Sequence, residues 1–302
     1  MRPLILHLRH LLFVLLLAAN VASAQEAASL LWEARAGGKT VYLFGTIHVG
    51  KADMYPLPKH VETAFNASKA LALEADVTDM QAVQAAMPLG MLPAGRTLEG
   101  ELPAEFAQPL QRAAGASGIP IEALRPMKPF LAMLALASLQ YGKLGYVPQL
   151  GLDHHFAQRA KSAATPVIAL ESFEAQLRMM DGLSKPLQQA MLKMTLDDIA
   201  SGKVAPMVTS LVSAWRRGDA IALYELLTSE SKRLPAPLAA EFNQKFLTGR
   251  NRQMLAGVEK ALAGKDTLFV AVGALHLIGP GSLNELLEKA GYSLKRVTGT
   301  AQ

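Results

Sequence analysis

The chain reads VYLFGTIH at residues 41–48 and LFVAVGALH at residues 268–276, and these stretches carry its clearest structural signal. Each is an apolar run typical of a buried strand, followed by Gly-x-x-His. Glycine permits a sharp turn or a close backbone approach, and polar groups converge where buried parallel strands end. The repeated pattern predicts two strands that carry His48 and His276 to one edge of a sheet.

Two carboxylates follow apolar runs in the same way. Glu74 comes after residues 71–73, and Glu171 comes after residues 167–170. If these strands lie beside the other two, two imidazoles and two carboxylates face one pocket. Such a nitrogen and oxygen donor set suits zinc, manganese, cobalt or iron. A bound metal would activate water and polarise a carbonyl, with the spare glutamate as general base. In the alternative interpretation each histidine is hydrogen-bonded at a turn, and each glutamate is the first solvated residue after its strand.

The rest of the chain predicts a single α/β domain: a mixed β-sheet core with strands from both ends of the chain and a large helical insertion. Strands are expected at 30–36, 40–44, 70–73, 167–170, 267–272 and 293–297. Helices are expected at 58–67 and 283–290, and mainly helical structure at 79–148 and 173–264, with breaks at Pro186, Gly218, Pro235 and Gly249. The apolar stretch 127–140 is long enough for a core helix and too short to span a bilayer.

The composition excludes several kinds of site. The 302 residues include 30 Lys and Arg, 25 Asp and Glu, and no cysteine. Without cysteine the chain has no disulfide, no thiolate-ligated zinc, no iron–sulfur cluster and no thiol nucleophile. Catalysis therefore depends on His, carboxylates, hydroxyls, Lys or a metal held by oxygen and nitrogen. The sequence also lacks a Walker loop, a Gly-x-Ser-x-Gly elbow and an HExxH motif, which disfavours nucleotide hydrolases, serine esterases and zincins.

Residues 1–24 are expected to be a secretory signal peptide, and 25–302 the folded domain. Arg2 and Arg9 precede an apolar run, and Ala22-Ser23-Ala24 is typical of a cleavage site; an uncleaved anchor is the alternative. Cleavage leaves 28 basic against 25 acidic residues, without a dense basic run interleaved with aromatics. We therefore expect a periplasmic or secreted protein with no nucleic-acid partner and no stable membrane span after cleavage.

The ordered set of short motifs resembles the TraB/GumN family, which is related to the TIKI proteases. The resemblance covers about residues 30–298 and rests on Gly45-Thr46-Ile47-His48, Leu57-Pro58, Glu74, Gly151-Leu152-Asp153, Leu170-Glu171 with Gln176, Arg250-Asn251, and the stretch from Val272 to Leu277 followed by Gly279 and Gly281.

The resemblance implies a metal-dependent peptidase of the kind that uses two Gly-x-x-His motifs and a glutamate. His48, His276 and Glu74 would then bind a divalent metal, manganese or cobalt rather than zinc, with Glu74 as ligand or base. Glu171 and Arg250 would be further members of the catalytic pocket. The wider superfamily also includes erythromycin esterase-like hydrolases and a haem-binding lipoprotein class, so fold alone does not fix the reaction. The substrate is expected to be a peptide or a small molecule.

The sequence is also compatible with two other functions. One is a non-catalytic periplasmic accessory protein of envelope or polysaccharide processes that holds a metal, haem or another ligand. The other is a metal-free esterase in which a His/Glu pair activates water.

Three neighbouring features of the sequence are open to simpler interpretations. Asp153 is expected to cap a helix rather than to serve the site. His154 and His155 point about 100° apart on that helix, so we expect a solvated face rather than a metal cluster. Arg250 has three open roles: clamping a substrate carboxylate, orienting a pocket glutamate, or pairing with a surface acid.

Overall fold

A six-stranded sheet forms the centre of the fold, with the strand order β4-β3-β5-β2-β1-β6. The computed structural model describes residues 28–299, so the predicted signal segment 1–24 lies outside the described residues. The strands are β1 (Leu31–Ala36), β2 (Lys39–Thr46), β3 (Leu71–Leu73), β4 (Val167–Ala169), β5 (Thr267–Gly273) and β6 (Ser293–Arg296). Every expected strand is present, and the α/β fold with a mixed sheet is confirmed.

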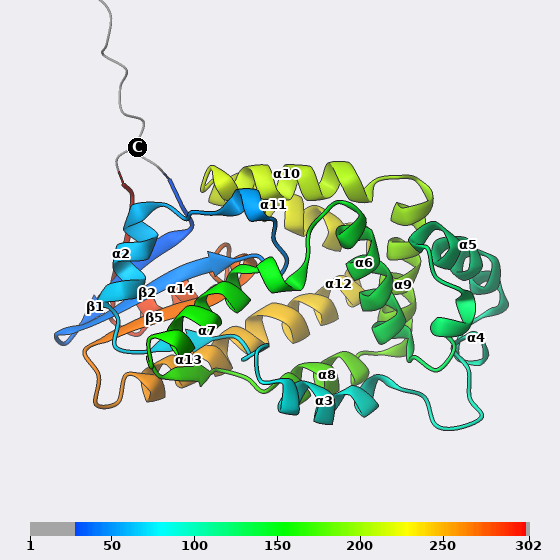
Figure 1. Cartoon of the computed structure of the whole chain (residues 1–302), viewed down its shortest axis with the longest axis horizontal. Helices are drawn as coiled ribbons and strands as arrows, with labels where there is room; N and C mark the ends of the chain where they lie inside the picture. The colour runs from blue at the N-terminus through cyan, green and yellow to red at the C-terminus, as the bar shows by residue number, and fades with distance from the viewer. Residues whose placement is uncertain (1–27, 300–302) are drawn as a thin grey trace, which may run out of the picture.

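The four strands β4, β3, β5 and β2 run parallel to one another, whereas β1 pairs antiparallel with β2 and with β6. A crossover between parallel strands of one sheet is almost always right-handed, so the direction in which it leads along the strand order sets the face that its helix covers. Helices α2 (Lys59–Ala67) and α7 (Leu152–Ser162) belong to crossovers that lead toward the β4 end of the sheet, and they cover one face. Helices α13 (Gly249–Ala261) and α14 (Leu283–Lys289) belong to crossovers that lead toward the β6 end, and they cover the other face (Figure 1).

Aromatic rings pack the face of the sheet beneath α2 and α7. Phe44 and Phe269 from adjacent strands meet Phe65 of α2 and Phe156 of α7, with ring centroids 5.0–6.1 Å apart. Such contacts add to the apolar area that the rings bury. Trp215 packs edge-on against Phe44 and donates its indole N–H to the Gly45 carbonyl at 2.8 Å. The turn that leads to His48 is therefore fixed from inside the core.

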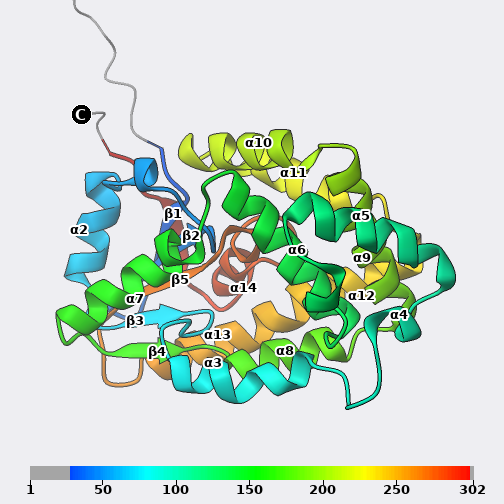
Figure 2. The same ribbon diagram turned by 45° about the vertical axis from the view of Figure 1, so that its right-hand side comes forward.

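Two helical segments pack together into a second apolar core beside the sheet (Figure 2). The first lies between β3 and α7 and the second between β4 and α13. They comprise α3 (Met80–Ala86), α4 (Leu98–Glu101), α5 (Ala107–Ser117), α6 (Pro129–Lys143), α8 (Phe173–Asp181), α9 (Lys185–Ala200), α10 (Val204–Arg216), α11 (Ala220–Ser231) and α12 (Ala236–Asn243). Of these, α10 and α11 contribute Ala214, Trp215 and Leu223 to the core at the sheet instead. The predicted helical insertion is thus present in two parts.

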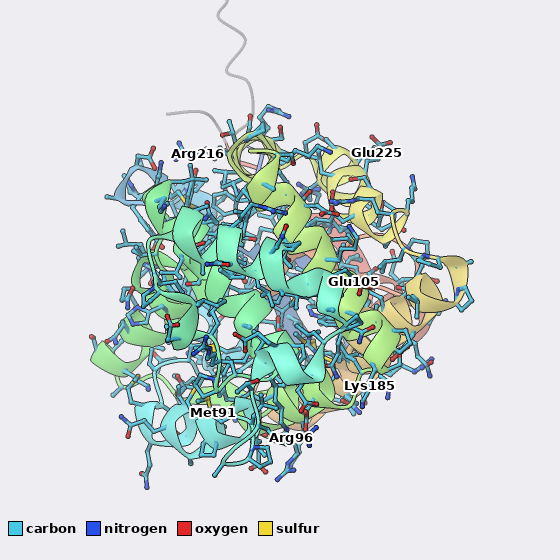
Figure 3. All side chains as sticks on the ribbon, turned by 90° about the vertical axis from the view of Figure 1, so that its right-hand side faces the viewer. Met91, Arg96, Glu105, Lys185, Arg216 and Glu225 are labelled. Carbon is cyan, nitrogen blue, oxygen red and sulfur yellow. The ribbon has the colours of Figure 1, made fainter. Side chains whose placement is uncertain are left out.

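The outer surface of this helical region carries charged side chains. The charged side chains of Arg96, Glu105 and Lys185 are exposed and project from its outer face (Figure 3). Helix α6, which contains most of the apolar stretch 127–140, buries Phe130 and Leu136 in the second core. The prediction of a core helix there is confirmed. Within residues 28–299, no helix combines the length and the apolar character that a membrane crossing requires.

Gly249 does not break the helical structure, contrary to the sequence prediction. Helix α12 passes through a π-helical turn, Gln244–Thr248, directly into α13, and Gly249 has helical φ and ψ angles of −66° and −48°. A Cβ at this position would lie 2.7 Å from the Gln244 carbonyl oxygen. Glycine is present because the wider π turn brings that carbonyl close, and π turns are frequent at functional sites.

Candidate active site

The four side chains predicted at strand ends lie along one edge of the sheet. In the strand order β4, β3, β5, β2, the residues that follow the strands are Glu171, Glu74, His276 and His48. The parallel register pairs Leu73 with Ala271 and Thr46 with Gly273, which brings these strand ends to the same level. A cavity of about 370 Å³ opens over this edge, and His48, Glu74 and His276 line it.

Asp153 orients the His48 imidazole. His48 Nδ1 donates to Asp153 Oδ2 at 2.9 Å, and Thr46 donates its hydroxyl to the other carboxylate oxygen at 2.7 Å. Asp153 is buried, whereas the His48 side chain is 63% exposed and faces the cavity. The Asp153 carboxylate raises the pKa of His48 above its usual 6.5. This arrangement leaves Nε2 directed at Glu74, with 4.0 Å between Nε2 and Glu74 Oε2.

Asn251 orients the second imidazole. The Asn251 amide donates to the Gly281 carbonyl at 2.7 Å, so its oxygen accepts from His276 Nδ1 at 2.6 Å. The protonated Nδ1 leaves a lone pair on Nε2, which lies 3.6 Å from Glu74 Oε2. Burial lowers the pKa of His276 to about 4, so this imidazole is neutral at pH 7.

Glu74 is a buried anion at the centre of the site. Arg250 and Gln176 hydrogen-bond Oε1, and the Gly273 amide donates to Oε2 at 3.1 Å. Burial raises the pKa of Glu74, but His48, His276 and Arg250 together outweigh it and lower the pKa to about 2. The carboxylate therefore remains ionised throughout the physiological range.

Arg250 links the two strand-end glutamates. Its Nε donates to Glu171 Oε1 at 3.0 Å and its Nη2 to Glu171 Oε2 at 2.7 Å, and the same guanidinium reaches Glu74. Of the three roles left open by the sequence, the contacts match that of orienting a pocket glutamate. Glu171 itself does not line the cavity, and it contacts Arg250, which does.

Glycine at position 273 keeps space between the cavity side chains. A Cβ there would lie 3.2 Å from His48 Nε2 and 3.3 Å from Glu74 Oε2. Gly151 has a similar role behind the site, since a Cβ there would lie 2.3 Å from the His48 carbonyl oxygen. Glycine is required at position 151, and a Cβ at position 273 would make the neighbouring side chains shift by a few tenths of an ångström.

Two sequence predictions near the site are wrong. Asp153 is not the N-cap of α7, because Gly151 occupies that position and Asp153 bonds His48 instead. His155 is not on a solvated face, since its ring packs against Tyr55 and Phe156 at centroid distances of 4.6 and 5.3 Å. Sequence reasoning also gave no role to Asn251 or Gln176. The only signal for those two was their place among the short motifs of the family resemblance.

The donor set fits a divalent cation, although the side chains are not already drawn together around one position. Within residues 28–299 no three His, Asp or Glu side chains form a complete metal-binding group. The neutral His276 Nε2 and the anionic Glu74 Oε2 are both acceptors, yet they face each other at 3.6 Å. A cation between acceptors of this kind relieves their repulsion, and imidazoles whose Nδ1 is held by a second residue are typical metal ligands.

Comparison with known proteins extends the likeness over almost the whole domain. The family model described as TraB/PrgY/gumN matches residues 30–296. YbaP of Escherichia coli, itself uncharacterized, is 30% identical over 253 residues, which are 83% of this chain and 89% of YbaP. The metalloprotease TIKI2 of Xenopus tropicalis is 25% identical over 90% of this chain and 60% of its own, and TIKI1 of Danio rerio is 24% identical over 88% and 63%. This chain thus spans about three fifths of the TIKI proteins. No solved structure matches.

Proposed function

We propose that this chain, which belongs to the TraB/PrgY/gumN family, is a metal-dependent hydrolase whose cation is held by His48, His276 and Glu74. One observation carries the proposal. Both imidazoles have their Nδ1 atoms engaged and direct Nε2 at the same carboxylate oxygen, at 4.0 and 3.6 Å. Two histidines and one carboxylate that leave open positions are a common ligand set for catalytic metals.

The bound cation would lower the pKa of a water molecule and polarise a substrate carbonyl. Metal binding requires His48 to lose the proton that the neighbouring carboxylates hold on it, so we expect proton release on loading. His276 needs no such change, because it is already neutral.

Glu74 acts as a ligand in this proposal rather than as the general base. A base works best when its pKa is near the working pH, whereas that of Glu74 is about 2. Arg250 and Gln176 hold its Oε1 and so direct Oε2 at the histidines. Arg250 and Glu171 are therefore positioning residues in the proposal, not groups that touch the substrate.

Peptide hydrolysis is the reaction we propose, and its support is the similarity to TIKI metalloproteases. We propose manganese or cobalt as the metal on the same basis. We further propose that the protein acts after export, since residues 1–24 have the pattern of a signal peptide.

Metal binding by the mature protein tests the ligand assignment. Calorimetric titration with Mn²⁺, Co²⁺ and Zn²⁺ should give about one equivalent for the wild type and none for His48→Ala or His276→Ala. His154→Ala is the matched control, because His154 lies on α7 and does not line the cavity. Circular dichroism confirms that each variant is folded.

A peptide-library digest with the loaded wild type then tests the reaction. Metal-dependent cleavage that both histidine variants lose would support the proposal. A folded wild type that binds no metal would overturn it and favour a metal-free esterase or an accessory protein.

A further inference from the structure

The wall of the cavity opposite the polar cluster is apolar. Helix α10 contributes Val208, Leu211 and Val212, helix α11 contributes Leu227, and the segment from α12 through the π turn contributes Phe242 and Phe246. These residues come from the helical segment that follows β4. The helices thus place an aliphatic and aromatic surface over the ends of the strands.

The charges that line the cavity are confined to its other end. The lining side chains with ionic or imidazole groups are His48, Glu74, Arg250 and His276, all at the sheet edge or beside it. Thr46, Tyr141 and Tyr146 also line the cavity, and the Thr46 hydroxyl already donates to Asp153. The lining side chains that come from α10, α11, α12 and the π turn carry no polar group, so a charged group would lose its hydration there without replacement.

The cavity is open to solvent, unlike a defect in core packing. The His48 side chain at its floor is 63% exposed, and Leu211, Leu227 and Phe246 in the wall are half-buried rather than sealed. Water gains few hydrogen bonds against such a wall. An apolar group that displaces this water is stabilised in proportion to the area it buries.

We infer that the cavity is a specificity subsite for an uncharged aliphatic or aromatic group adjoining the bond that is cleaved. The inference rests on the proposed function, because it places the cleaved bond at His48, Glu74 and His276. The substrate class is then a peptide with a large apolar side chain at this position, and polyanions are excluded. Leu211 and Leu227 are the specificity-determining residues.

The depth of the subsite is set by a shared wall. Leu227, Phe242, Leu247 and Leu275 line both this cavity and a cleft of about 1010 Å³ on its far side. Truncating Leu227 should join the two spaces and accept a longer group. Enlarging Leu211 should shorten the space that is available.

Straight-chain hydroxamic acids from acetyl to decanoyl test this subsite, because each carries the same metal-binding head and a different apolar tail. With the Mn²⁺-loaded wild type, calorimetry should show an affinity gain of about fourfold for each added methylene until the cavity is full. Leu211→Phe should end that gain at a shorter chain, and Leu227→Ala at a longer one. Leu226→Phe is the matched control, because Leu226 is on α11 outside the cavity and should leave the series unchanged.

A metal-free arm separates this inference from the proposed function. The uncharged fluorophore N-phenyl-1-naphthylamine should bind the metal-free wild type, and Leu211→Phe should weaken that binding at least fivefold while Leu226→Phe does not. If this pattern holds and no metal binds, the apolar subsite stands and the hydrolase proposal fails. If hydroxamates bind with equal affinity at every chain length, the subsite is overturned and the metal site stands.

Discussion

Asp153 and His48 are 105 positions apart in sequence, yet Asp153 Oδ2 accepts a hydrogen bond from His48 Nδ1 at 2.9 Å. The contact joins the loop after β2 to the first turn of α7 and determines which ring nitrogen faces the cavity. Asp153 is buried, so its carboxylate is shielded from solvent, while the other side of the His48 ring faces the cavity.

Asp153→Asn should lower the metal affinity of the site by roughly 10–100-fold with little change in stability. The amide keeps the shape of the carboxylate but lacks the charge that raises the pKa of His48. An NMR titration of the His48 ring should therefore show a lower pKa in the variant. Asp197→Asn, on the exposed face of α9, is the control for loss of one acidic residue. Unchanged affinity in Asp153→Asn would contradict the orienting role.

Gly273→Ala should impair the site more than the fold. Its φ of −48° suits alanine, so the backbone is not strained, but the added methyl group would lie 3.2 Å from His48 Nε2. We expect at least a tenfold loss of metal affinity and a change of less than about 1 kcal/mol in unfolding free energy. Gly142→Ala on α6 meets nothing within 4 Å and should change neither quantity. Equal losses in both variants would argue against a steric effect at the site.

Arg250→Met should destabilise the protein by about 3–5 kcal/mol, because it leaves two buried carboxylates without their cation. Adding Glu171→Gln should recover part of that loss, since one uncompensated charge is then removed. Urea denaturation of the two single variants and the double variant measures the coupling. Strict additivity of the two free-energy changes would show that Arg250 and Glu171 do not interact.

The Glu33 carboxylate should make stability depend on pH well away from the cavity. Hydrogen bonding by Arg35, with a further contribution from Lys295, lowers the pKa of Glu33 from 4.5 to about 2. A lowered folded-state pKa contributes stability that is complete above 4.5 and is lost as the pH falls toward 2. Because both partners are solvent-exposed, we expect roughly 1–2 kcal/mol.

Glu33→Gln tests this linkage. The variant should be less stable than the wild type at pH 7, and the difference should shrink at pH 3. Urea unfolding at the two pH values measures it, and a difference that stays constant would refute the assignment to Glu33.

The sequence was sufficient to predict the strand-end residues and insufficient for the residues behind them. His48 and His276 each follow an apolar strand, as Glu74 does, so local patterns identified these residues, whereas their convergence depends on the strand order that the structure supplies. Asp153 lies in the first turn of α7, where a short polar residue is usually a cap or solvated, and Asn251 lies within the continuous helix that follows the π turn. Their contacts with the histidines depend on how helices pack against strand ends. The local sequence does not determine that packing.

The sequence predicts the helices that cover the strand ends, but not their arrangement. Apolar periodicity indicated helices over 173–264, but not that α10, α11 and the π turn would lean over the strand ends and line the cavity. The local sequence around Gly249 is misleading in a similar way. A glycine between helical runs is typical of a break, and here it is required by a tight contact within a continuous helix.

Strand β5 lies between β3 and β2, although it is encoded near the end of the chain. During synthesis the sheet therefore lacks its central member until residues 267–273 emerge. A shortened chain that stops before them has neither the partner that joins β2 to β3 nor His276. The cavity therefore cannot be complete before these residues are made, and chains that stop before them are expected to lack the site.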